Sequence, residues 1–541
     1  ALLRGAAVAR GHRPRLLLPH GGLMNIPLSI MLFWPAVLGL LAAVLPRGLA
    51  RFVELAGAFV PLAYVVVLVL DFDPAGGPQY VTDVPWIPEL GVRYSLAIDG
   101  LNLWLVVLTT VLFAASALWI AFRPVHHSPR LFAFHFGIAE TAVLGALFAQ
   151  DLALFVLFFD LMLVPIYFLV GQWGEGDRVA ATVKLVIYTL VGSLLMLAAA
   201  VATGVLVAQA NDQPLSFAIN DLIGNTLSPT TQNWLFLGFA LAFLVKMPAF
   251  PFQGWMPDGY RAMPLPVLVF FSGVVSKVAV YGFLRIVLPI LPDAALDFQM
   301  PLMILGVISI LYGSAMAFTQ TNTRLILGYS SMAQLGFIII GIFSLTAEGA
   351  QGAILQAVNH GLVVAPVFFI IVLLAERAGG SEDIRDMGGL ALRAPVLAGL
   401  FLIAAMATLA IPGSANFVGE FLILLGAFKS ELVIAALAFV GVAMASVYML
   451  RMFIRTMHNR TGPAVESREL GVRDAMVIVP LVLAILAFGL YPQRALEQSE
   501  NSARASIRAV QERTGAGTQA AAKPSLTREG RTATASGETH P

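Results

Sequence analysis

Long apolar segments separated by short polar ones follow one another along the chain up to about residue 492. Each has about 20 residues, the length at which an α-helix crosses the hydrocarbon core of a bilayer. The pattern predicts an all-α, polytopic membrane protein with fourteen transmembrane helices. It excludes a transmembrane β-barrel, whose strands are short and alternate in polarity. The approximate helix cores are 26–46, 52–70, 101–122, 131–150, 152–170, 183–208, 233–253, 265–289, 301–319, 325–345, 352–375, 396–427, 433–450 and 474–492.

The two ends of the chain lack this pattern. Residues 1–23 contain arginines and no acidic residue, and their apolar stretch is too short for a signal peptide. We interpret 1–23 as an extension ahead of a start at Met24, with a targeting segment as the alternative. Residues 493–541 are rich in small and polar residues, which predicts a disordered tail.

The composition agrees with a membrane location. Only 12% of the residues are charged, against roughly 25% in soluble proteins, and the mean hydropathy is +0.85. A net charge of +1 gives no reason to expect a nucleic-acid partner. The chain has no cysteine, so we expect it to bind no iron–sulfur cluster and to hold no cofactor of its own.

Lysine and arginine are unevenly distributed among the loops. The odd-numbered loops hold sixteen of them if Lys184, at the edge of the sixth helix, is counted, and the even-numbered loops hold three at most. Because loops rich in Lys and Arg stay in the cytoplasm, we predict that the odd-numbered loops are cytoplasmic and that both termini lie on the outer side.

Away from the helix ends, a short list of seven ionisable residues lies in the middle of predicted helices, where such residues are costly and usually face a bundle interior or a hydrated path. One interpretation is that buried acids and bases merely neutralise each other between helices. A polar path through the membrane explains so many of them better. The seven are His135, Glu140, Asp160, Lys246, Lys277, His360 and Glu420.

Two predicted helices contain prolines beside an ionisable residue: Pro248 follows Lys246, and Pro412 precedes Glu420. A broken helix persists in a membrane only where protein buries it or it lines water. Because the breaks fall at the fourth helix of two five-helix sets, we predict two inverted repeats with broken helices 7 and 12. The predicted units are residues 24–130 (helices 1–3), 131–290 (helices 4–8), 301–455 (helices 9–13) and 474–492 (the last helix).

A buried lysine next to a carboxylate has the properties of a proton carrier. Burial disfavours the charged form of a lysine, and a nearby carboxylate favours it. Movement of the carboxylate would therefore switch the lysine between holding and releasing a proton. We find no nucleophile–base motif or phosphate loop, so redox or hydrolytic chemistry in this chain is not expected.

Three motifs carry a family resemblance: 158–168 (FFDLMLVPIYF), 244–248 (LVKMP) with 255–258 (WMPD), and 412–421 (PGSANFVGEF). They closely resemble the subunit M family of the proton-pumping NADH-quinone oxidoreductase, respiratory complex I, whose mitochondrial counterpart is subunit 4. The resemblance extends from about residue 98 to about residue 491. It implies an antiporter-like subunit that passes protons while electrons move from NADH to quinone elsewhere in the complex.

The resemblance also implies roles for residues and partners. Asp160 would pair with Lys246, Lys277 would be the central relay, and Glu420 would be the terminal residue toward the outer side. FMN, iron–sulfur clusters and quinone would be bound by other subunits. Antiporter-like subunits L and N and membrane lipid would be its neighbours in a bacterial inner membrane. The implied catalytic residues are Asp160, Lys246, Lys277, His360 and Glu420, supported by Gln334, Glu140, Pro248 and Pro412.

The sequence departs from the family pattern at several positions. Asp160 stands where the family has glutamate, so a direct pair with Lys246 would need closer helices or a bridging water. Gln334 replaces a histidine and can bind water but cannot take up a proton. Glu420 favours subunit M, because L and N usually carry lysine there. Alternatives are an Mrp-type cation/proton antiporter component, a membrane subunit of a hydrogenase or formate-linked complex, and a scaffold.

Overall fold

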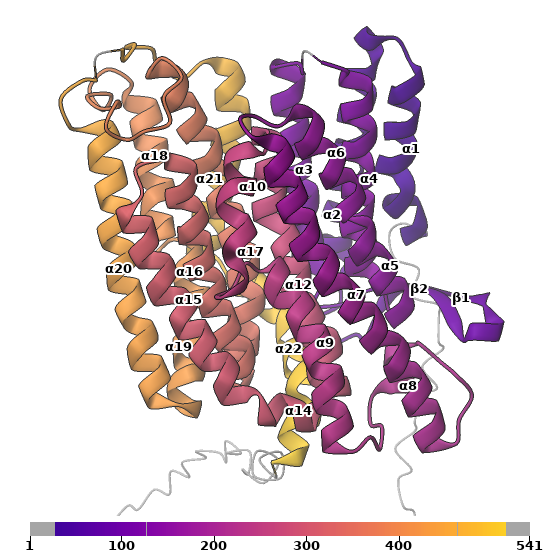
Figure 1. Cartoon of the computed structure of the whole chain (residues 1–541). Helices are drawn as coiled ribbons and strands as arrows, with labels where there is room; N and C mark the ends of the chain where they lie inside the picture. Colours follow the sequence, from indigo (N-terminus) through magenta and orange to yellow (C-terminus); the bar gives the residue numbers. More distant parts are fainter. Residues whose placement is uncertain (1–26, 126, 463, 515–541) are drawn as a thin grey trace, which may run out of the picture.

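The apolar segments form helices that run roughly side by side between the two ends of a bundle (Figure 1). The computed structural model describes residues 27–125, 127–462 and 464–514. The predicted extension at 1–23 therefore lies outside the described residues. The first half of the chain contains α1 (Leu28–Val44), α2 (Arg47–Asp71), α3 (Leu103–Phe122), α4 (Pro129–Phe148), α5 (Leu152–Leu161), α6 (Leu163–Trp173), α7 (Arg178–Asn211), α8 (Ile219–Leu222), α9 (Pro229–Lys246), α10 (Met256–Ala262), α11 (Leu265–Phe270), α12 (Ser276–Gly282), α13 (Leu288–Ile290) and α14 (Pro292–Asp297).

Four short segments of the first half are not α-helical. The 3₁₀ segments are η1 (Pro88–Leu90) and η2 (Phe252–Trp255), and the π-helical segments are η3 (Phe271–Val275) and η4 (Phe283–Val287).

The second half of the chain is also helical and ends with a polar helix, α22. The helices of the second half are α15 (Gln299–Thr319), α16 (Thr323–Phe343), α17 (Ala347–Arg377), α18 (Pro395–Thr408), α19 (Ala415–Ser430), α20 (Leu432–Met457), α21 (Val472–Leu490) and α22 (Gln493–Arg513).

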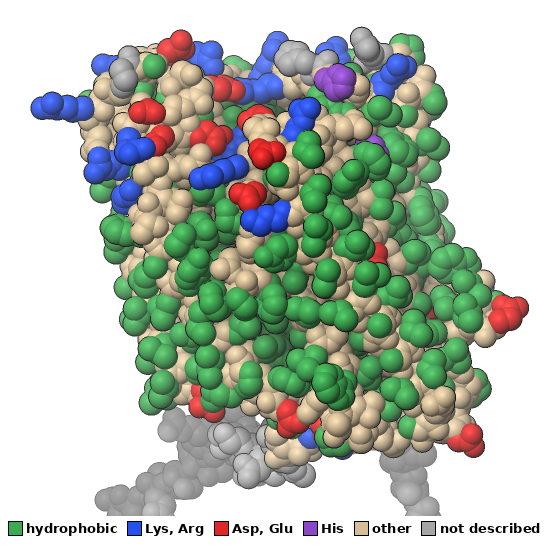
Figure 2. Space-filling model, viewed as in Figure 1, with side chains coloured by type: hydrophobic (Ala, Val, Ile, Leu, Met, Phe, Trp, Pro, Cys, Tyr) green, Lys and Arg blue, Asp and Glu red, His purple; other side chains and the backbone are tan. Residues whose placement is uncertain are grey.

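Eleven helices in the described part of the chain are long and apolar enough to cross a membrane, judged by length and composition. On the face of the bundle seen in Figure 2, apolar side chains cover the middle, and most charged side chains lie toward the ends. Such an apolar belt is expected where a protein faces lipid. The prediction of a polytopic, mainly helical membrane protein is confirmed.

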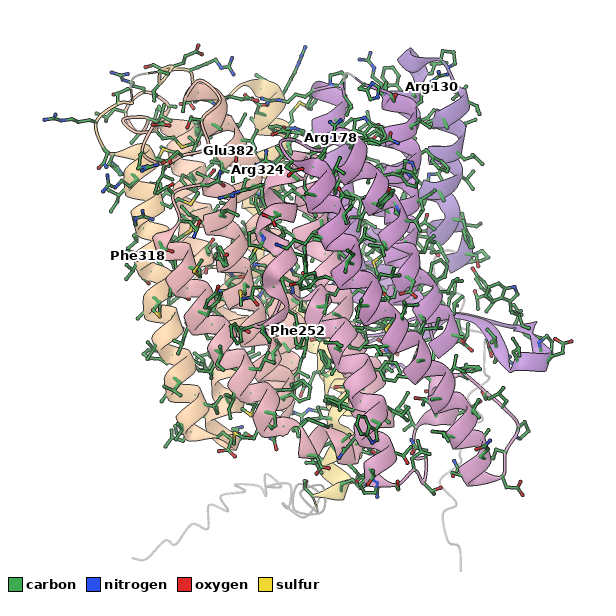
Figure 3. The ribbon with its side chains drawn as sticks, viewed as in Figure 1. Arg130, Arg178, Phe252, Phe318, Arg324 and Glu382 are labelled. Atoms are coloured by element: carbon green, nitrogen blue, oxygen red, sulfur yellow. The ribbon has the colours of Figure 1, made fainter. Side chains whose placement is uncertain are left out.

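Lys and Arg side chains are concentrated at the end of the bundle drawn at the top of Figure 2. Figure 3 shows Arg130, Arg178 and Arg324 toward this end. Arg324 is buried there, where it forms an ion pair with Glu382 (Nε to Oε1, 2.5 Å) and donates to the Met263 carbonyl at 2.7 Å. The charge asymmetry predicted from the loops is therefore present in the folded chain.

The all-α prediction is wrong between residues 79 and 98. There β1 (Gln79–Ile87) and β2 (Val92–Ile98) form an antiparallel hairpin with Thr82 opposite Leu96. Gly91 closes the turn with a positive φ of 64°, and a Cβ at this position would lie 2.0 Å from the Leu215 carbonyl oxygen. In β2 the large apolar residues Val92, Tyr94, Leu96 and Ile98 occupy alternate positions, which is a strand signal shorter than a 20-residue apolar run.

The prediction of a disordered tail from residue 493 is also wrong for its first part, because residues 493–513 form α22. Its buried side recurs at helical spacing and includes Ala495, Ala503 and Ile507, which pack on the bundle. Arg504 and Glu500 form an i,i+4 ion pair on the solvent side. The low average hydropathy of the segment concealed this amphipathic period. Residues 515–541 lie outside the described residues.

The loop between α17 and α18 is tied down by Asp383. Its carboxylate accepts hydrogen bonds from Arg385 Nη2 at 2.7 Å and from Thr321 Oγ1 at 2.9 Å. The hydrogen bonds from the Arg385 side chain lower the pKa of Asp383 to about 2, against about 3.9 in an unfolded chain. Because the folded pKa is the lower one, Asp383 stabilises the loop above about pH 4, and this contribution is lost as the pH falls toward 2.

We expect Asp383→Asn to loosen this loop at neutral pH, because the amide cannot replace the carboxylate toward the Arg385 guanidinium. Trypsin should then cut after Arg385 several-fold faster in the solubilised protein. Asp212→Asn is the control, since Asp212 is an exposed residue with φ 50° where asparagine is well tolerated. Equal cleavage rates in wild type and Asp383→Asn would contradict this role.

Candidate functional site

Asp160 and Lys246 lie at the ends of two helices that both contact α7. Asp160 is one residue from the end of α5, and Lys246 is the last residue of α9. Lys246 is buried, and its ammonium lies 4.5 Å from the centre of the Phe159 ring. Asp160 lies within Coulombic range, beside Ser193 of α7, but no ion pair within 4.0 Å joins it to Lys246 in the described chain. Lys246 thus lies on an aromatic face and not in a direct ion pair with Asp160.

The break after Lys246 has a structural cause. Pro248 cannot continue the hydrogen-bond ladder of α9, and the chain resumes as η2 and α10. Trp255 Nε1 donates to the Val245 carbonyl at 3.0 Å, and Ser309 Oγ accepts from Phe250 N at 3.0 Å. The interrupted backbone is therefore satisfied by side chains, and the predicted break at helix 7 is present.

Lys277 lies at the start of α12, directly after the π-helical turn η3, and is fully buried. Its ammonium donates to the Ser272 carbonyl at 2.6 Å and to Ser276 Oγ at 3.2 Å. The wide turn of a π-helix frees carbonyl groups, and such turns are frequent at functional sites. Lys277 thus has neutral oxygen ligands, and no ion pair neutralises it in the described chain.

His360 of α17 lies near Lys277, where α17 crosses η3. The two backbones meet at a pair of glycines: a Cβ on Gly361 would lie 2.5 Å from the Gly273 carbonyl oxygen. His360 is buried, and its Nδ1 has no hydrogen-bond partner among the described residues. The contact joins a helix of the first predicted repeat to one of the second beside both ionisable groups.

Glu420 of α19 is buried in a group of amides. Gln356 Nε2 of α17 donates to Gln334 Oε1 at 2.7 Å and to Glu420 Oε1 at 3.3 Å. The structure thus brings Gln334 and Glu420 together through the amide of Gln356. Gln356 was not predicted from the sequence, although its amide lies one helical turn before His360 on the same helix.

The second break lies between α18 and α19, around Pro412 and Gly413, as predicted. Gly413 has a φ of 92°, which favours glycine. Asn359 Nδ2 donates to the Ala415 carbonyl at 2.6 Å at the start of α19. Both side-chain polar atoms of the fully buried Asn416 lack a partner among the described residues. Buried polar atoms without a protein partner are the kind that ordered water binds.

Two predicted residues are not part of this group. His135 stacks on Phe168 with ring centres 4.6 Å apart and planes 18° apart. Glu140 lines a small cavity with Glu54 and residues of α1 and α2. We therefore use the term polar axis for the remaining set alone, which is Asp160, Lys246, Lys277, His360, Gln334, Gln356 and Glu420.

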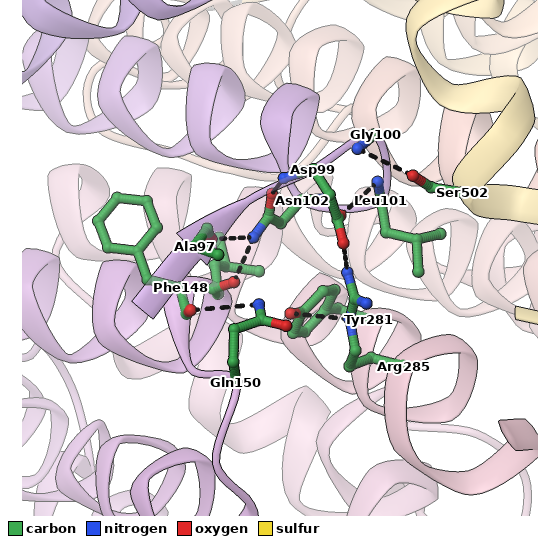
Figure 4. Close-up of polar contacts among 11 residues, drawn as sticks. Ala97, Asp99, Gly100, Leu101, Asn102, Phe148, Gln150, Tyr281, Arg285 and Ser502 are labelled. Carbon is green, nitrogen blue, oxygen red and sulfur yellow. Dashed lines mark hydrogen bonds and ion pairs between the residues drawn. The ribbon is translucent and has the colours of Figure 1, made fainter. Parts of the chain in front are cut away.

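A further polar cluster lies under α22 and was missed in the sequence (Figure 4). Arg285 of η4 forms an ion pair with Asp99, just before α3, and its Nε donates to Tyr281 Oη at 3.2 Å. Above it Gly100 N donates to Ser502 Oγ of α22 at 3.1 Å. The available signal was the spacing of Lys277, Tyr281 and Arg285 at i, i+4 and i+8, which puts them along one side of a helix.

Comparisons with known proteins agree with this arrangement. Residues 149–446 match the family described as NADH:quinone oxidoreductase/Mrp antiporter, TM. NADH-quinone oxidoreductase subunit M of Mycobacterium tuberculosis is 36% identical over 87% of this chain and 92% of its own length. The subunit M of Escherichia coli K12 is 37% identical over 79% and 86%.

Solved structures give the same result. A chain of respiratory complex I from Thermus thermophilus with bound NADH superimposes with a TM-score of 0.82 at 30% identity, covering 90% of this chain and all of that one. A chain of the Mrp complex from Dietzia has a TM-score of 0.77 at 22% identity, covering 89% and 99%, which shows a shared fold. The chain therefore belongs to the NADH:quinone oxidoreductase/Mrp antiporter family, as an antiporter-like membrane-arm subunit of complex I.

Proposed function

We propose that the polar axis carries protons across the membrane while electrons pass from NADH to quinone in other subunits. The observation that supports this most is that Lys246 and Lys277 are buried next to helix irregularities without an ion pair among the described residues. A buried cation with no paired anion is costly and readily changes its protonation. A purely structural lysine would instead be expected to lie within ion-pair distance of a carboxylate.

The proposed cycle starts at Asp160. When a change in a neighbouring subunit moves Asp160 toward Lys246, the carboxylate stabilises the protonated lysine. When Asp160 moves away, the buried ammonium loses that support and releases its proton toward Lys277. His360 and the amides of Gln334 and Gln356 then connect Lys277 with Glu420, from which the proton leaves on the outer side.

We propose that this axis lies within fourteen membrane crossings. The count follows if α5 and α6 form one crossing, α9 and α10 one broken crossing, α11 to α13 one, and α18 and α19 another broken one. Crossings 4–8 (131–290) and 9–13 (301–455) are then the two inverted repeats, and each contains one interrupted helix. The Gly273–Gly361 contact lies between them.

We also propose an orientation and a setting. The end of the bundle rich in Lys and Arg faces the cytoplasm, and α22, which packs beside α13 and α14 at the other end, lies outside. The membrane is the bacterial inner membrane, and the neighbours are subunits L and N. FMN, iron–sulfur clusters and quinone belong to other subunits, since a chain without cysteine offers no thiolate ligand.

The experiment that tests this proposal uses Glu420→Gln in the intact complex. The amide keeps the shape and the contact with Gln356 but cannot accept a proton, so NADH-driven proton translocation into inverted vesicles should fall at least several-fold while the complex assembles. Glu431→Gln, a partly exposed acid at the far end of α19, is the matched control. Unchanged translocation in Glu420→Gln would refute a path through this residue.

A further inference from the structure

Two buried glutamates face a common cavity away from the polar axis. Glu54 of α2 and Glu140 of α4 are 8% and 1% exposed, and both line a space between α1, α2 and α4 that has room for about one water molecule. Oε1 of each carboxyl group has no hydrogen-bond partner among the described residues. We call these two residues the carboxyl pair.

The backbones around the cavity are held close together. A Cβ on Gly137 of α4 would lie 2.3 Å from the Pro35 carbonyl oxygen of α1, and a Cβ on Gly39 would lie 3.0 Å from the Ala133 carbonyl oxygen. Thr141 Oγ1 accepts from Ala36 N at 3.1 Å and joins the same two helices. Because glycines and a cross-helix hydrogen bond fix the walls, the two carboxyl groups cannot readily turn away into lipid.

None of the residues that line the cavity is a cation. Helices α1 and α3, which pack against the pair, contain no ionisable residue. On α2, Arg51 is exposed and lies over the Phe52 ring at 4.8 Å. On α4, His135 turns to Phe168 of α6.

The other helices that touch α4 direct their ionisable groups elsewhere. Asp160 of α5 lies beside Ser193 of α7, and Lys277 of α12 donates to the Ser272 carbonyl. No ion pair to Glu54 or Glu140 within 4.0 Å exists in the described chain. If both carboxyl groups were ionised, two negative charges would share one apolar cavity, which is strongly unfavourable.

We propose that Glu54 and Glu140 form a proton-binding site that keeps a shared proton at neutral pH. The two groups titrate as a unit, so loss of the first proton makes the remaining one harder to remove. The site lies between α2, which precedes the predicted repeats, and α4, the first helix of the first one. It does not depend on proton transport through the polar axis, and the test below measures the carboxyl groups directly.

The test is labelling of the wild-type complex with dicyclohexylcarbodiimide, which reacts with protonated carboxyl groups in apolar surroundings. The carbodiimide takes up the carboxyl proton, the carboxylate adds to its central carbon, and rearrangement leaves a stable N-acylurea on the residue. Peptide mapping should find the label on Glu54 or Glu140 at neutral pH, decreasing as the pH rises. Glu376, which forms an ion pair with Arg123, is the internal control and should stay unlabelled.

Glu54→Gln then tests whether the pair is coupled. Without its neighbour, Glu140 no longer feels a second negative charge, so the midpoint of its labelling should move down by about 1 pH unit or more. Three results would overturn the proposal: no label on either residue of the wild type at any pH, an unmoved midpoint in the variant, or protection of the wild type by NaCl but not by choline chloride. The first and third need no variant to fold.

Discussion

Lys246→Ala is expected to abolish NADH-driven proton pumping through this subunit while the complex still assembles. The variant removes the buried ammonium that lies over Phe159 and near Asp160, and no other lysine lies on α9. A loss of translocation to below about a tenth corresponds to at least about 1.4 kcal/mol in the transfer barrier. Fluorescence quenching in inverted vesicles, measured beside quinone reduction, gives the readout.

Lys429→Ala is the matched control for that variant. Lys429 lies near the end of α19, is half exposed and pairs with Glu348 at 2.5 Å, a surface ion pair of small energetic worth. Its removal should leave translocation near the wild-type value. Normal pumping in Lys246→Ala would exclude this lysine as a proton carrier, and failed assembly in Lys246→Ala would show a structural role instead.

Gly361→Ala is expected to destabilise the complex and to impair proton translocation together. The new Cβ would lie 2.5 Å from the Gly273 carbonyl oxygen and 2.6 Å from Leu108 Cδ2. Backbone cannot yield as a side-chain end can, so α17 and η3 must separate, at about 1–3 kcal/mol for overpacking of this kind. His360 moves with α17, which lengthens its distance from Lys277. Thermal unfolding of the purified complex measures the first effect and vesicle translocation the second.

Gly399→Ala is the control for this variant, because it replaces a helical glycine that makes no close contact. Gly399 is an exposed residue within α18, and nothing lies within 4 Å of the position of its Cβ. Alanine there should be neutral or should stabilise the helix by about 0.5–1 kcal/mol. If Gly361→Ala unfolded at the wild-type temperature, the backbone contact with Gly273 would not be a tight one.

Most of the fold could be predicted because membrane helices are specified by local composition. The apolar residues 323–343 form one continuous helix, as their sequence predicts, and Pro412 indicates the break in helix 12. The hairpin at 79–98 and α22 could not be found in this way. The hairpin depends on the pairing of its two strands, and α22 depends on an amphipathic period. An average of hydropathy over a segment detects neither of these features.

The burial of most of the candidate site residues could be predicted one by one, but their contacts could not. Burial of Lys246, Lys277 and Glu420 follows from their place in apolar runs. That Lys246 lies on Phe159, or that Lys277 has two oxygen ligands within its own helix, depends on π-helical turns and on packing. Glu54 was overlooked because its partner Glu140 is 86 positions away in sequence, and only the fold brings them to one cavity.

The position of α22 has a consequence for the order in which the protein is made. Arg494 donates to the Val69 carbonyl across 425 positions of the chain, and Ser502 accepts from Gly100 across 402. Because α22 follows every apolar helix in the described chain, these two hydrogen bonds form only after all of those helices have been synthesised. Completion of this face is therefore a late step in biogenesis, and a ribosome that stalls before α22 leaves it open.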